Sequence, residues 1–127
     1  MNTIEERKAA MRQRTKAFAS SVVRFYIGLD KHREEQRVLG KQLLRSGTSV
    51  AANYRESSRA RSADEFTAKV DLCAQEADES QLWLELLRDD CGVAPTKVNP
   101  IWQEADELIA IFVTMSKNAK AKKKNES

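Results

Sequence analysis

The sequence predicts an all-α protein, a single antiparallel, up-down-up-down four-helix bundle. Apolar residues make up 41% of the 127 residues, which is enough for one hydrophobic core. The chain has only 4 Gly and 2 Pro, too few for the many tight turns of an all-β fold. Its apolar residues recur three or four positions apart, as they do on the buried face of a helix.

The first helix is predicted over residues 3–31. Thr3 and Glu6 form a capping box at its start, in which each side chain can bind a free backbone N–H group. One apolar face follows, formed by Ile4, Met11, Phe18, Val22, Phe25 and Leu29. The second helix is predicted over residues 34–58, with Leu39, Leu43, Val50 and Tyr54 on a common side.

The third helix is predicted over residues 62–91, and a second capping box opens it at Ser62. Its apolar positions alternate four and three apart, as in helices that pack into bundles. The fourth helix is predicted over residues 99–119, with Asn99 as its N-cap and Pro100 in its first turn. The three connections are short, so consecutive helices should be antiparallel.

Residues 1–119 are therefore predicted to form the bundle, and residues 120–127 a basic, mobile tail. The side chains that we expect to be buried are Phe18, Phe25, Phe66, Val70, Cys73, Ala77, Leu84 and Phe112. The longest apolar run has six residues, so we expect no membrane span. The N-terminal residues do not resemble a secretory signal, and a cytoplasmic location follows as an expectation.

The net charge of +3 conceals a strong asymmetry. Residues 1–62 hold 14 Lys and Arg against 6 Asp and Glu, a net charge of +8. Residues 63–116 hold 3 against 12, a net charge of −9, and residues 117–127 hold 5 against 1. The first two predicted helices are therefore basic, and the last two are acidic.

Three interpretations of this asymmetry stay open. Helices of opposite sign can attract one another within the bundle, or the faces of different subunits can meet in a ring. Alternatively, the basic residues bind nucleic acid, and no aromatic residue lies among them, so they would contact phosphates. The candidate nucleic-acid-binding residues are Arg7, Lys8, Arg12, Arg14, Lys16, Lys122, Lys123 and Lys124.

The second predicted helix carries a polar stripe beside its apolar one. The stripe consists of Gln42, Arg45, Ser46, Ser49, Asn53 and Glu56. Gly40 and Gly47 in the same helix would allow a neighbouring backbone to approach closely. In an antiparallel hairpin Arg45 comes level with Glu76 and Glu79, so we predict a charge-assisted contact there. Leu43 and Trp83 would shield this contact, whereas the alternative is that these charges are simply solvated.

The segment from Gln42 to Glu56, QLLRSGTSVAANYRE, resembles the signature of the four-helix-bundle proteins encoded in 23S rRNA intervening sequences. Residues 62–66 (SADEF) and 79–87 (ESQLWLELL) resemble the third helix of that family. The resemblance covers roughly residues 15–118. The family usually has Gly after the Glu of the motif, whereas Ser is present here, which predicts that the helix continues further.

The resemblance implies a small bundle that assembles as a pentamer and has no established enzymatic activity. It also implies similarity to the accessory protein of diversity-generating retroelements, which binds nucleic acid and a reverse transcriptase through basic surface. The polar stripe, together with Glu76 and Glu79, would then have a structural role. We expect a homo-oligomer that binds RNA or DNA. The alternative is a protein–protein adaptor for a nucleic-acid-processing protein such as a reverse transcriptase.

The sequence contains no set of residues that predicts catalysis. His32 is the single histidine, and it lies among charged residues where two helices are joined. Cys73 is on the core stripe, and Cys91 has no basic residue close by in the sequence to activate its thiol. A di-metal site in a bundle needs Glu-x-x-His motifs, which the chain lacks. We therefore predict no enzymatic activity, no metal and no cofactor.

Overall fold

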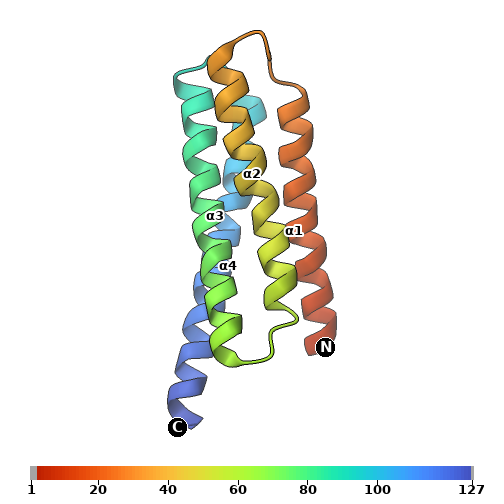
Figure 1. Cartoon of the computed structure of the whole chain (residues 1–127), viewed down its shortest axis with the longest axis vertical. Helices are drawn as coiled ribbons and strands as arrows, with labels where there is room; N and C mark the ends of the chain where they lie inside the picture. The colour runs from red at the N-terminus through yellow and green to blue at the C-terminus, as the bar shows by residue number, and fades with distance from the viewer. Residues whose placement is uncertain (1–2, 127) are drawn as a thin grey trace.

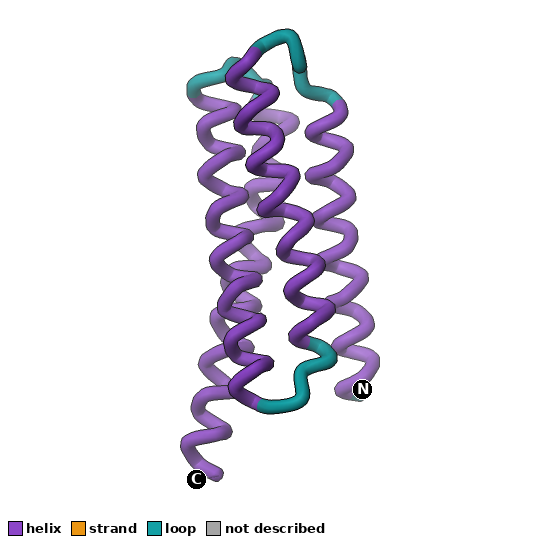
Figure 2. Tube along the Cα trace, in the orientation of Figure 1, coloured by secondary structure: helices purple, strands orange, loops and turns teal. Residues whose placement is uncertain are grey.

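The structure is a computed structural model that describes residues 3–126, and it contains four long helices packed side by side (Figure 1). The helices are α1 (Ile4–Ile27), α2 (Glu34–Ser57), α3 (Ala63–Asp89) and α4 (Pro95–Glu126). The chain reverses direction at each connection, so both ends of the chain lie at the same end of the bundle (Figures 1 and 2). No strand occurs within residues 3–126, and the predicted fold class is confirmed.

Both predicted capping residues bind the first turn of their helix. The hydroxyl of Thr3 accepts a hydrogen bond from the Glu6 N–H at 3.0 Å, and the hydroxyl of Ser62 accepts one from the Glu65 N–H at 3.1 Å. α1 ends at Ile27 rather than at residue 31, because the chain turns at Gly28 and sends Leu29 into the core. The beginnings of α1 and α3 are thus fixed by side chains next to them in the sequence.

The predicted start of α4 is wrong by one turn. The helix begins at Pro95, where the missing N–H group costs nothing, and the backbone carbonyl of Ala94 accepts hydrogen bonds from the first turn. Val98 is fully buried, and its burial favours this extra turn. Pro100 therefore lies inside the helix, and Asn99 is a helical residue rather than the N-cap.

The predicted end of α4 is also wrong. The helix passes residue 119 and continues to Glu126, so the expected boundary between bundle and tail falls inside a continuous helix. Lys120 is 3.4 Å from Asp71 in an ion pair, and Lys123 pairs with Asp64. These two contacts to α3 lie along the part of α4 that the sequence assigned to the tail.

The core runs along the bundle axis and contains residues from all four helices. Its largest fully buried side chains are Phe18, Val22, Leu43, Val50, Val70, Leu84, Leu87, Val98, Leu108 and Phe112. Six of the eight side chains predicted to be buried are buried. Phe25 and Phe66 are only partly buried. Phe25 faces α4 across a cleft, because α1 and α4 are the pair of neighbouring helices that contact each other least.

α1 and α2 approach closely at two glycines. A Cβ atom added to Gly40 would lie 2.5 Å from Leu29 Cδ1, and one added to Gly47 would lie 2.8 Å from both γ-carbons of Val22. Both distances are far shorter than van der Waals contact. The two glycines therefore let side chains of α1 and of the connection after it pack directly against the α2 backbone.

Candidate nucleic-acid interface

Two of the predicted nucleic-acid-binding residues of α1 are paired with carboxylates of the chain itself. Arg14 binds Glu104 through two hydrogen bonds of 2.9 and 2.8 Å, and it also reaches Glu107 at 3.2 Å. The hydrogen bond to Glu104 is the largest cause of a raised pKa for Arg14. Lys8 is 3.7 Å from Glu5. Arg14 thus ties α1 to α4, and its charge is neutralised within the fold.

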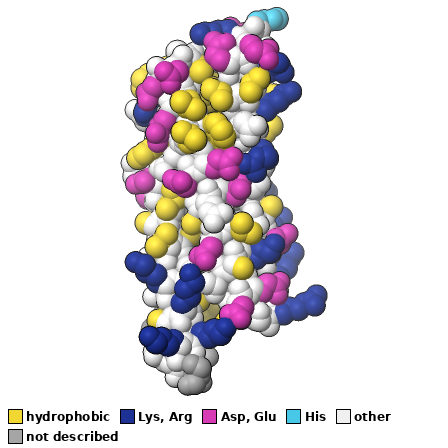
Figure 3. Space-filling view, turned by 60° about the vertical axis from the view of Figure 1, so that its left-hand side comes forward, with side chains coloured by type: hydrophobic (Ala, Val, Ile, Leu, Met, Phe, Trp, Pro, Cys, Tyr) yellow, Lys and Arg dark blue, Asp and Glu magenta, His cyan; other side chains and the backbone are white. Residues whose placement is uncertain are grey.

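The tail lysines belong to the last turns of α4, beside the first half of α3. Lys123 is held beside Asp64 at the start of α3, and Lys122 is exposed in the same last turns of α4 together with Lys124. Figure 3 shows several Lys and Arg side chains toward the C-terminal end of this face of the bundle, with Asp and Glu side chains among them and above them. The ion pairs that Lys120 and Lys123 make are thus with α3.

A different set of cations comes together between α1 and α2. Arg12 and Lys16 of α1 face Arg55 and Arg59 at the end of α2, across a cleft of about 470 Å³ that Ala9 and Gln13 complete. We call it the basic cleft. Arg12 is partly buried and its guanidinium donates to the Ser58 hydroxyl at 3.4 Å, whereas the other three cations are exposed.

The four cations of the basic cleft have no ion pair with any carboxylate of the described residues. The nearest acid in the sequence, Glu56, is directed the other way and pairs with Lys69 of α3 at 2.6 Å. Four positive charges thus meet on one surface without neutralisation. Such a surface attracts polyanions.

Helical spacing and the direction of the chain explain how the basic cleft forms. Ala9, Arg12, Gln13 and Lys16 lie on one face of α1, because three or four residues complete a turn. Arg55 and Arg59 are likewise one turn apart. Because α1 and α2 are antiparallel, the end of α2 lies beside the first half of α1.

Sequence analysis identified Arg12 and Lys16 but missed Arg55 and Arg59. Their spacing of four residues at the end of a helix predicted to be antiparallel to a basic helix was the available signal. Arg7 is exposed near the start of α1 and does not line the basic cleft. The sequence indicated basic residues along one helix, whereas the structure groups two of them with two arginines from the end of α2 and the turn after it.

The contact predicted for Arg45 is present. Its guanidinium donates to Glu76 at 3.1 Å and to Glu79 at 2.5 Å, and Glu79 also accepts from the Trp83 indole at 3.2 Å. These carboxylates raise the pKa of Arg45, chiefly through the hydrogen bond that Arg45 donates to Glu79. The expected shielding is incomplete, because the Arg45 side chain is 51% exposed and Leu43 is buried in the core.

The remaining polar-stripe residues make short-range contacts. The hydroxyls of Ser46 and Ser80 share a hydrogen bond of 2.7 Å inside the α2–α3 seam. Asn53 donates to the backbone carbonyl of Ser49 at 3.0 Å, and Gln42 is exposed. The Ser46–Ser80 contact joins α2 to α3, and the Asn53 contact lies within α2.

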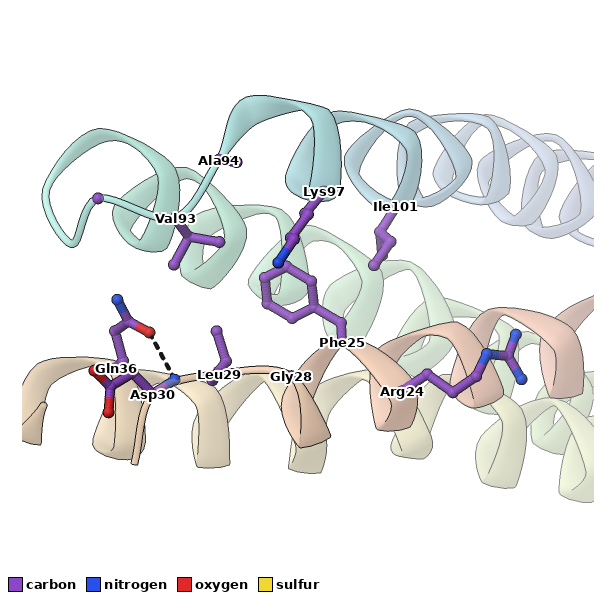
Figure 4. Close-up of a pocket in the computed structure, with 11 residues that line it drawn as sticks. Arg24, Phe25, Gly28, Leu29, Asp30, Gln36, Val93, Ala94, Lys97 and Ile101 are labelled. Carbon is purple, nitrogen blue, oxygen red and sulfur yellow. Dashed lines mark hydrogen bonds between the residues drawn. The ribbon is translucent and has the colours of Figure 1, made fainter. Parts of the chain in front are cut away.

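A second cleft, of about 570 Å³, lies between the end of α1 and the start of α4 (Figure 4). Phe25, Leu29, Val93 and Ile101 are its apolar lining. Arg24 of α1 and Lys97 of α4 are its cations. Gln36 closes one end, because its side chain accepts from the Asp30 N–H and donates to the Cys91 carbonyl, which joins two connections. We call it the α1–α4 groove.

No constellation for covalent or metal chemistry accompanies these surfaces. Among the residues described, no group of three or more His, Cys, Asp or Glu could hold a metal ion. Burial raises the pKa of the Cys73 thiol to about 12 and also raises that of Cys91, so neither is an activated nucleophile. His32 is exposed in the turn between α1 and α2. None of the four helices, as far as they are described, is long and apolar enough to cross a membrane.

Comparison with known proteins gives a family and a related structure. The model of the 23S rRNA-intervening sequence protein family matches residues 7–124. A crystal structure from Bacteroides thetaiotaomicron VPI-5482, of a protein with unknown function from the S23 ribosomal protein family, is 30% identical. That alignment covers 87% of this chain and 97% of the other, with a TM-score of 0.79. A search of curated proteins finds no match.

Proposed function

The chain belongs to the 23S rRNA-intervening sequence protein family, and from this premise we propose that it is a non-enzymatic, oligomeric bundle that binds RNA or DNA through basic surface. The observation that carries the proposal is the basic cleft, where four cations meet without a carboxylate partner among the described residues. Removing counterions from phosphates would supply the free energy of binding. We place this activity in the cytoplasm.

The paired cations support this assignment by contrast. Arg14 and Arg45 each bind two carboxylates, so the acidic second half of the chain neutralises part of the basic first half. In the basic cleft, four cations without an ion pair among the described residues come together on one surface. It therefore retains attraction for an external polyanion.

The test measures fluorescence anisotropy of labelled RNA and DNA with increasing salt. Four phosphate contacts per protomer predict that log affinity for duplex DNA falls with log salt at a slope of about −3 to −4. Reversing Arg55 and Arg59 to Glu should lower affinity by about ten-fold or more. Arg37→Glu/Lys41→Glu is the matched control, because it makes the same charge change on two cations of α2 outside the basic cleft.

The homo-oligomer in this proposal is a pentamer, a number that comes from the family resemblance. The charge asymmetry makes contacts between unlike faces favourable, and several copies of the basic cleft in one assembly would add their weak phosphate contacts. Light scattering at micromolar concentration should give the mass of five chains. A monomer mass would contradict this part of the proposal.

A second candidate function is that of an adaptor for a nucleic-acid-processing protein, for which the α1–α4 groove is the specific observation. Its apolar lining and two cations would suit a partner segment with apolar and acidic side chains. Binding through this surface would resist salt, unlike binding to phosphates. No binding of RNA or DNA by the wild-type protein at low salt would favour the adaptor.

A further inference from the structure

The basic cleft offers nothing on which a base could stack. Its lining residues are Ala9, Arg12, Gln13, Lys16, Arg55 and Arg59, so within residues 3–126 it has no aromatic wall. Tyr54 is next to Arg55 in sequence, but its ring is 3% exposed and packs against Phe112 at a centroid distance of 6.2 Å. Proteins that bind single strands without sequence preference rely on such stacking. The basic cleft lacks that mode of binding.

Three of the four cations are arginines, and this choice matters for the ligand. A guanidinium presents planar N–H groups that can bind two oxygens of one phosphate, whereas a lysine acts as a point charge. Gln13 adds a neutral amide donor to the same lining. The donor set therefore fits phosphate oxygens and supplies directional hydrogen bonds.

The walls of the basic cleft are also built before any ligand arrives. All but one of its residues lie on the helices α1 and α2, and Arg59 lies in the turn just after the C-cap of α2. Arg12 is partly buried and held toward Ser58. A double helix presents phosphates at a fixed, dense spacing, so neither partner has to be ordered on binding. A flexible single strand would lose conformational freedom and gain no stacking in return.

We propose that the basic cleft is a clamp for the sugar–phosphate backbone of double-stranded nucleic acid, held by arginine forks without contact to the bases. The inference rests on the proposed function and deepens it by naming the form of the ligand. It implies weak dependence on sequence, because phosphates carry no sequence information. It also implies a preference for duplexes over single strands of the same composition.

The experiment uses the full chain and two labelled probes, a short RNA duplex and an unstructured single strand of the same length. We expect the duplex to bind about ten-fold more tightly at low salt. The variant Arg12→Lys/Arg55→Lys/Arg59→Lys keeps every charge but removes the forks, and should weaken duplex binding by about ten-fold. Arg33→Lys/Arg37→Lys/Arg88→Lys, the matched control on three arginines outside the basic cleft, should bind as the wild type does. Circular dichroism and light scattering confirm that each variant keeps its helices and its assembly.

The outcomes separate this inference from the proposed function. Absence of binding to either probe at low salt overturns both. Equal or tighter binding of the single strand overturns the clamp and leaves nucleic-acid binding standing. Duplex binding that the triple lysine variant retains at full strength shows that charge alone suffices, which also overturns the arginine forks. If Arg55→Glu/Arg59→Glu binds as well as the wild type, the interface lies outside the basic cleft.

Discussion

The two sides of α2 differ in how their polar groups are satisfied. Toward α3, Arg45 has two carboxylate partners, Ser46 bonds to a serine, and Glu56 is paired with a lysine. Toward α1, the contact is made by glycines against apolar side chains, and it ends at the basic cleft. On the α3 side of α2, charged side chains are thus paired with opposite charges. On the α1 side, the cations of the basic cleft have no such partner among the described residues.

The difference teaches that composition alone does not locate a binding surface. Arg45 and Arg55 are both exposed arginines of α2, and Arg55, which has an acid as its direct neighbour in the sequence, is the one without an ion pair among the described residues. What separates them is the element opposite each one, acidic α3 for Arg45 and basic α1 for Arg55. The α3 side therefore contributes to holding the bundle together, and the α1 side retains charge for a ligand.

The largest effect that we predict concerns the α3 side, where the buried Cys73 thiol lies 3.7 Å from the Val50 carbonyl. Burial raises the pKa of Cys73 from 9.0 to about 12, so the unfolded chain ionises first. The protonated Cys73 thiol therefore makes its full contribution to the free energy of unfolding below pH 9, and this contribution is lost as the pH rises from 9 toward 12. In that interval the free energy of unfolding should fall by about 1.4 kcal/mol per pH unit relative to Cys73→Ala.

Urea titrations of both proteins across this pH range measure the effect. The difference between them isolates the thiol, because other titrating groups are common to both. If the two proteins lose stability in parallel, Cys73 ionises as easily in the bundle as in the unfolded chain. Water would then reach the Cys73 thiol between α2 and α3.

The next effect concerns the α1 side. Gly47→Ala places a methyl group 2.8 Å from both γ-carbons of Val22, a β-branched, fully buried side chain that cannot rotate away. We expect a net loss of about 1–2 kcal/mol, because the steric cost exceeds the gain in helix propensity. Gly28→Ala is the control, since its nearest new contact is an ordinary 3.6 Å. Equal stability of both variants would mean that α1 and α2 can separate slightly without cost.

A smaller effect is expected at Arg45. Its side chain is 51% exposed, while Glu76 and Glu79 are 18% and 33% exposed. Solvent screens such a contact, so Arg45→Ala should cost about 1 kcal/mol rather than the several expected for a shielded pair. A double-mutant cycle with Glu79→Gln should return a coupling energy of similar size. A coupling near zero would make the pair a solvated surface contact.

The sequence was sufficient for the fold and for the Arg45 contact, for the same physical reason. Apolar spacing, capping residues and short connections act within one helix or one hairpin, and the hairpin register sets Arg45 level with Glu76. The ends of α4 were missed, because they depend on burial of Val98 and on ion pairs with α3, which are tertiary effects.

The candidate site needed the structure for a similar reason. Whether a cation is available depends on carboxylates far away in the sequence, as the pairing of Arg14 with Glu104 demonstrates. From the sequence, Arg14 belongs to the same cluster as Arg12 and Lys16. In the bundle, Arg14 pairs with carboxylates of α4, whereas Arg12 and Lys16 line the basic cleft. It also left out Arg55 and Arg59, because they belong to a helix that was interpreted through its polar stripe.

The smallest predicted effect carries the comparison to α1, where its sign should differ between a cation of the basic cleft and a cation that is paired with α4. Lys16 stands one turn from Arg12 and faces Arg55 and Arg59, with no ion pair among the described residues. Lys16→Gln removes repulsion between like charges, so it should raise the free energy of unfolding by a few tenths of a kcal/mol while weakening nucleic-acid binding. Arg14→Gln, which removes the same charge from the same helix, should lower stability because it leaves Glu104 without its partner. Urea denaturation at low and high salt checks both signs, and screening should erase the gain at Lys16. A lower free energy of unfolding in Lys16→Gln would show that Lys16 makes a favourable contact in the basic cleft. The four cations would then not repel one another as proposed.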